Sequence, residues 1–138
     1  METFTADIRG IKERKGVVIT GGKEIEFSAP KMFGGNESKL CPEELLTASI
    51  GACYALTFEA FLNKFRIEVE DFYCHVETVI ERKEKGYRFT KARIDVEVKA
   101  KNETKDKVII AVEKAKKYCF ITNAFNFDVE MNYNVEGV

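Results

Sequence analysis

Polar and apolar residues alternate in short stretches near the N-terminus, and charged residues and glycines separate these stretches. Residues 4–11, 17–20 and 24–27 have the period-two or β-branched character of strands. The segments between them, 13–16 and 21–23, have the composition of tight turns. The sequence therefore predicts an antiparallel meander of three strands, followed by a loop over residues 28–41.

The segment 42–65 is the longest apolar run in the chain. Pro42 suits the first position of a helix, and Glu43 and Glu44 in the first turn complement the helix dipole. Because apolar residues occupy nearly every face, we expect a helix that is surrounded by protein. Hydroxyl residues and Glu59 interrupt the run, which argues for a buried core helix and against a membrane span.

The second half of the chain has longer alternating segments. Residues 67–82 and 87–100 alternate on either side of a polar turn, and they predict two long antiparallel strands with one wet face. Residues 102–117 have the amphipathic pattern of a second helix, and residues 127–135 alternate again. The predicted order is β-β-β-α-β-β-α-β, an α+β fold in which antiparallel sheets pack around two helices. A chain of 138 residues suits one domain, residues 1–138.

Composition and charge argue against several classes of function. Apolar residues make up 45% of the chain and charged residues 33%, as in a soluble globular protein. The formal net charge of -1 provides no basic surface, so no nucleic-acid partner is expected. The first residues lack the pattern of a signal peptide, which predicts a cytoplasmic protein with mostly reduced thiols. The spacing of four cysteines and one histidine predicts neither a metal site nor a cofactor.

Two of the cysteines are candidates for chemistry. Cys53 lies in the middle of the apolar helix, and Cys119 follows the basic end of the second helix. A helix rises about 1.5 Å per residue, so Glu43 and Cys53 of one chain lie roughly 15 Å apart along the axis. They could meet if a second copy of the helix packed antiparallel against the first, which predicts a two-fold homodimer. Small residues would allow that approach: Ala48, Ser49, Gly51, Ala52 and Ala55.

Two segments resemble the cysteine motifs of the OsmC/Ohr family of hydroperoxide-reducing proteins. Residues 42–53, PEELLTASIGAC, resemble the first motif, and residues 114–124, KAKKYCFITNA, resemble the second. The resemblance implies an OsmC-like fold, an intertwined two-fold dimer and a thiol-dependent peroxidase. In that scheme the Cys53 thiolate attacks a hydroperoxide and becomes a sulfenic acid, and Cys119 condenses with it to form a disulfide. A dithiol reductant, either a lipoyl or a thioredoxin-like protein, would then reduce the disulfide.

The family also uses an Arg held by a Glu to favour the thiolate. Glu43 matches the Glu position directly. Arg14 matches the position of the Arg in the Ohr branch, whereas the OsmC branch uses the loop where this chain has Lys31. The segment 30–35 resembles a third, less characterised branch. The sequence leaves open whether Arg14, Lys31 or neither activates Cys53, because a Lys lacks the planar fork of an Arg.

Several aromatic residues are candidates for an apolar peroxide pocket: Phe33, Tyr54, Phe58 and Phe120. Two other functions stay open. One is a non-catalytic OsmC-like dimer that binds a small apolar ligand. The other is a cysteine hydrolase that pairs His75 with Cys53, although no third orienting residue can be named. Cys74 is expected to pack in the core, and Cys41 to be exposed near the site.

Overall fold

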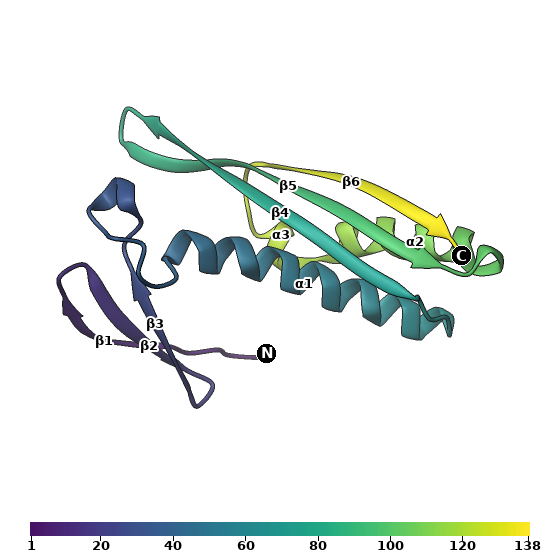
Figure 1. The fold of residues 1–138 in the computed structure, drawn as a ribbon, viewed down its shortest axis with the longest axis horizontal. Helices are drawn as coiled ribbons and strands as arrows, with labels where there is room; N and C mark the ends of the chain where they lie inside the picture. The colour runs from purple at the N-terminus through teal and green to yellow at the C-terminus, as the bar shows by residue number, and fades with distance from the viewer. The chain divides into compact units, whose positions relative to one another are not determined.

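The computed structural model describes residues 1–138. Contacts between residues divide them into two compact units, Met1–Leu46 and Thr47–Val138, and the division falls inside the first α-helix. The organisation of the chain as a single domain stays a prediction. Each unit contains one three-stranded sheet, in the order β1-β2-β3 and β4-β5-β6 (Figure 1).

The N-terminal unit is the predicted antiparallel meander. Its strands are β1 (Asp7–Lys12), β2 (Lys15–Thr20) and β3 (Lys23–Ser28). The first hairpin turns at Glu13 and Arg14, both with positive φ, as a two-residue hairpin turn requires. Gly16 was expected in this turn and lies instead within β2. A Cβ there would come within 2.7 Å of the ends of the Ile11 and Phe27 side chains, so a larger residue would require these side chains to shift.

A loop and a short 3-10 helix, Lys31–Phe33, lead to α1 (Pro42–Phe65), which has the predicted bounds. Cys41 was expected to be exposed, but it is buried and caps this helix. Its backbone N–H donates to Glu44 Oε1 at 3.1 Å, and the Glu44 N–H donates to Cys41 Sγ at 3.4 Å. This reciprocal arrangement is a capping box in which a thiol takes the place of a hydroxyl. Cys41 therefore has a structural role at the start of α1.

The sheet of the C-terminal unit contains one antiparallel and one parallel pair of strands. Strands β4 (Asp71–Lys83) and β5 (Gly86–Ala100) form the predicted antiparallel hairpin. Strand β6 (Asp128–Gly137) pairs with β5 in parallel, which corrects the expectation of purely antiparallel sheets. The reason is the connection from β5 to β6. It runs through α2 (Lys105–Tyr118) and the short α3 (Phe120–Asn123), and such a helical crossover brings the chain back for a parallel strand.

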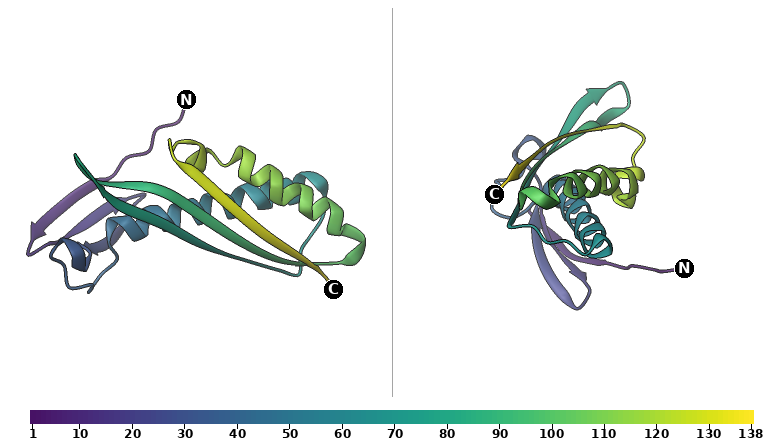
Figure 2. Two further views of the ribbon diagram at one scale, coloured as in Figure 1. Left: turned by 90° about the horizontal axis from the view of Figure 1, so that it is seen from above. Right: turned by 90° about the vertical axis from the view of Figure 1, so that its right-hand side faces the viewer.

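The core of the C-terminal unit lies between this sheet and the helices. Figure 2 shows α1 and α2 on the same face of the sheet. Alternate residues of β5 are buried against them: Ala92, Ile94, Val96, Val98 and Ala100. The length and mean hydropathy of α1 would also suit a membrane span, as they would for many core helices. Its buried residues join the β5 cluster, as expected of a core helix. The expectation that protein surrounds α1 is wrong for the single chain, because the opposite side of the helix is exposed, with Leu56 at 67%.

Gly51 on α1 faces its own sheet. A Cβ at Gly51 would come within 3.0 Å of Val76 Cγ2, on β4. Gly51 was expected to allow a partner helix to approach, but it lies against β4 of its own chain, where a larger residue would require Val76 to shift. Ala48 and Ala52, by contrast, are exposed.

We expect Tyr54→Phe to lower the free energy of unfolding by about 1 kcal/mol, because the substitution removes a buried hydrogen bond. Tyr54 is fully buried, and its hydroxyl donates to the carbonyl oxygen of Val112 on α2 at 3.0 Å. Urea unfolding monitored by circular dichroism measures the effect. Tyr73→Phe is the matched control, because Tyr73 is 56% exposed on β4. Equal losses in the two variants would contradict the assigned role of the buried hydroxyl.

Candidate functional site

The C-terminal unit brings Cys53 and Cys119 together as free thiols. Cys53 is 7% exposed on the core-facing side of α1, and Cys119 is fully buried at the junction of α2 and α3. Burial raises the pKa of the Cys53 thiol, and the adjacent Cys119 thiol raises it further. Two thiols from distant parts of the chain are therefore close enough to interact electrostatically.

The position of Cys119 follows from the way in which α2 ends. The Cys119 N–H donates to the carbonyl oxygen of Ala115 at 3.0 Å and closes the last turn of α2. Its backbone is then extended, and the next turn begins as α3. The Asn123 N–H donates to the Cys119 carbonyl oxygen at 3.0 Å, and the Asn123 side chain donates to the Lys117 carbonyl oxygen at 2.9 Å. The backbone of Cys119 is thus held from both sides.

Sequence reasoning missed two threonines beside the thiols. The Thr122 hydroxyl donates to Cys119 Sγ at 3.1 Å. The Thr57 hydroxyl donates to the Cys53 carbonyl oxygen at 2.8 Å, and it lies close enough to the thiol to lower the pKa of Cys53. Thr122 follows Cys119 by three residues, and Thr57 follows Cys53 by four. Such a spacing places two side chains on one face of a helix. That spacing was the available signal.

A largely apolar groove of about 710 Å³ opens beside Cys53. Its wall consists of the exposed side of α1 and of the α2–α3 junction, and the lining residues are Ser49, Ala52, Cys53, Leu56, Thr57, Ala60, Phe61, Tyr118, Phe120 and Ile121. Phe120, a predicted pocket residue, is among them. The predicted pocket residues Tyr54 and Phe58 lie instead in the core, where both rings stack on Phe72.

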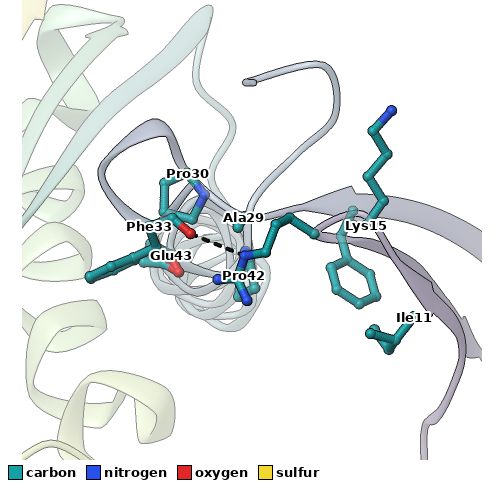
Figure 3. Close-up of a pocket in the computed structure, with 9 residues that line it drawn as sticks. Ile11, Lys15, Ala29, Pro30, Phe33, Pro42 and Glu43 are labelled. Atoms are coloured by element: carbon teal, nitrogen blue, oxygen red, sulfur yellow. Dashed lines mark hydrogen bonds between the residues drawn. The ribbon is translucent and has the colours of Figure 1, made fainter. Parts of the chain in front are cut away.

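The N-terminal unit holds the predicted charged residues in a second, smaller pocket of about 190 Å³ (Figure 3). Arg14, Phe33 and Glu43 all line it, and the Arg14 Nε donates to the Phe33 carbonyl oxygen at 3.1 Å. One carboxylate oxygen of Glu43, Oε2, is buried. Lys31 is exposed on the 3-10 helix and is not part of the lining. Of the two candidate cations, Arg14 is the one that shares a pocket with Glu43.

The remaining candidate residues lie elsewhere. Cys74 is half-buried on the helix-facing side of β4, whereas His75 points to the other side of the sheet and is 3.5 Å from Glu77 Oε1. This placement separates His75 from Cys53 and contradicts the hydrolase alternative. No group of three or more His, Cys, Asp or Glu side chains is arranged to hold a metal ion.

Comparisons with known proteins cover most of the chain. The sequence profile of a family described as OsmC-like protein matches residues 34–134, a range that includes Glu43, Cys53 and Cys119. The uncharacterized protein YmaD of Bacillus subtilis is 25% identical over 126 residues, which are 88% of this chain and 84% of YmaD.

Solved structures have the same fold. An OsmC-like protein of unknown function from Vibrio cholerae is similar with a TM-score of 0.85 and 20% identity, over 97% of this chain and 100% of that chain. An organic hydroperoxide resistance protein OsmC from Legionella pneumophila gives a TM-score of 0.78 and 24% identity, over 99% and 98% of the two chains. The predicted OsmC-like fold is confirmed.

Proposed function

This chain belongs to the OsmC-like family, and on that premise we propose that it is a thiol-dependent hydroperoxide reductase. The observation that carries the proposal is the pairing of two free, buried thiols, Cys53 and Cys119, beside an apolar groove. A protein named for organic hydroperoxide resistance shares the fold, which supports the same substrate class.

In the proposed reaction Cys53 is the nucleophile. Its thiolate attacks one oxygen of the hydroperoxide, the O–O bond breaks, and the alkoxide leaves as the alcohol after taking up a proton. Cys53 is thereby oxidised to a sulfenic acid. The Cys119 sulfur attacks the Cys53 sulfur, hydroxide leaves as water, and a disulfide forms. An external dithiol, a lipoyl or thioredoxin-like protein, restores both thiols by exchange.

This chemistry requires a positive charge near Cys53. Burial raises the pKa of Cys53, whereas a hydrogen bond from the Ile121 backbone N–H and the nearby Thr57 hydroxyl act in the opposite direction. Because burial is the largest of these effects, a nearby cation is needed to favour the thiolate at neutral pH. Arg14 is the proposed cation, and Glu43 is proposed to hold it.

The cation is proposed to come from a second copy of the chain. Glu43 precedes Cys53 by ten residues on α1, which separates them by roughly 15 Å along the helix axis. A homodimer could place the Arg14 pocket of one copy beside Cys53 of the other. The large exposed apolar side chains at the groove, Leu56 at 67% and Phe120 at 73%, favour such an association.

A thiol count tests the proposed function. The reduced protein is treated with a small excess of cumene hydroperoxide, and free thiols are titrated under denaturing conditions. We expect two of the four thiols of each chain to be lost, as one disulfide between Cys53 and Cys119. An unchanged thiol count would instead favour the alternative, a non-catalytic dimer that binds an apolar ligand in the groove.

A further inference from the structure

Thr122 has a buried hydroxyl that is directed at a thiol. The residue is 7% exposed, and its hydroxyl donates to the sulfur of Cys119, which is fully buried. We propose that Thr122 is a positioning residue for the resolving thiol. Its hydroxyl orients Cys119 Sγ toward Cys53 and stabilises the negative charge on this sulfur when it attacks. This inference rests on the proposed two-thiol function.

The backbone alone leaves the Cys119 sulfur free to rotate. Hydrogen bonds from Cys119 and Asn123 fix the main chain on both sides of the thiol, but rotation about the Cα–Cβ bond can still move Sγ. Thr122 is β-branched and therefore stiff at this same bond, so its hydroxyl is a fixed donor. Burial also keeps water from competing for that donor. The Thr122 hydroxyl thus selects one position of the sulfur.

Ile121, the residue before Thr122, contacts the other thiol, that of Cys53. The Ile121 backbone N–H forms a hydrogen bond to Cys53 that favours its thiolate. Ile121 and Thr122 are consecutive residues of α3, so one short turn supplies a donor to each of the two sulfur atoms. We infer that this turn holds the two sulfurs in the arrangement from which the disulfide forms.

The consequence concerns the fate of the sulfenic acid. Attack by Cys119 on Cys53 sulfenic acid gives the disulfide and water. A second hydroperoxide can instead oxidise the sulfenic acid to a sulfinic acid, with release of a second alcohol, and this product is not restored by dithiols. A slower attack by Cys119 gives the second reaction more time. Thr122 therefore protects Cys53 from irreversible oxidation.

The test compares Thr122→Val, which removes the hydroxyl and keeps the shape, with Thr122→Ser, which keeps the hydroxyl. Formation of the sulfenic acid should proceed at the wild-type rate in both variants. Disulfide formation should be about tenfold slower in Thr122→Val, the loss expected for a hydrogen bond to a charged sulfur. Sulfinic acid at Cys53, measured by mass spectrometry, should rise in that variant and return to the wild-type level in Thr122→Ser.

The midpoint potential of the Cys53–Cys119 pair gives a readout without hydroperoxide. The hydroxyl stabilises the reduced pair more than the disulfide, so a tenfold change in the equilibrium would lower the potential of Thr122→Val by about 30 mV. Titration against a dithiol buffer measures this. If Thr122→Val does not fold, Thr122→Ala replaces it in both measurements.

Two results would overturn the inference. One is wild-type resolution and potential in the variant without the hydroxyl. The other is a Thr122→Ser variant that is as slow as Thr122→Val, because a retained hydroxyl would then fail to restore disulfide formation. A wild-type protein that forms no disulfide with hydroperoxide would refute the proposed function instead. In that case the midpoint potentials, which are measured without hydroperoxide, still show whether the Thr122 hydroxyl stabilises the Cys119 sulfur.

Discussion

Replacing Cys53 by serine is expected to abolish hydroperoxide reduction, with a loss of at least about 10³-fold in rate. A serine hydroxyl does not ionise near neutral pH and cannot form the sulfenic acid, so the first step has no nucleophile. The measurement is consumption of cumene hydroperoxide in the presence of a dithiol, with the thiol count as a second readout. Both should show no reaction.

Other cysteine variants identify the step that is lost. Cys74→Ser is the matched control, because Cys74 is a half-buried thiol of the same unit that has no part in the scheme. It should retain the wild-type rate. Cys119→Ser should keep the first step and accumulate Cys53 sulfenic acid, which dimedone traps. A Cys53→Ser variant that still consumes hydroperoxide would refute the assignment of the nucleophile.

Replacing Arg14 by glutamine is expected to lower the rate at neutral pH by about 10²-fold, because a cation near the thiolate is lost. Burial already raises the pKa of Cys53, and loss of the cation raises it further. The thiolate then forms only at higher pH. The activity of Arg14→Gln should therefore rise with pH over a range in which the wild-type rate is flat. Lys31→Gln is the control and should leave the rate and its pH profile unchanged.

Mixed dimers test whether Arg14 acts on the same chain or on its partner. Arg14→Gln and Cys53→Ser chains are co-expressed with different tags, and doubly tagged dimers are purified. If Arg14 acts across the interface, each mixed dimer contains one intact site of two, and the purified mixed dimers recover about half of the wild-type activity. No recovery, or a monomer in sedimentation, would contradict the proposed dimeric site.

Local patterns in the sequence predicted the six strands, the two long helices and the two cysteine motifs, but not the short α3, where a loop was expected. The bounds of α1 and the order of the strands follow from periodicity, turn residues and an N-terminal proline, all of which act over a few residues. Such patterns also indicated that Cys53 belongs to a core helix. They carry no information on which residues from distant segments meet, because the same hydrophobic period is compatible with several ways of packing the helices and strands together.

The tertiary structure decided the rest. The helical crossover made β6 a parallel strand. Packing placed Gly16 in β2 beside Phe27, where a turn had been expected, and Gly51 against β4, where a partner helix had been expected. The two predicted site cysteines meet because α1 and the end of α2 pack on the same sheet. The Thr122 hydroxyl, by contrast, reaches Cys119 Sγ over only three residues, a local contact at the junction of α2 and α3. The residue types for this chemistry can be read from the sequence, but their contacts depend on packing between segments that are far apart along the chain.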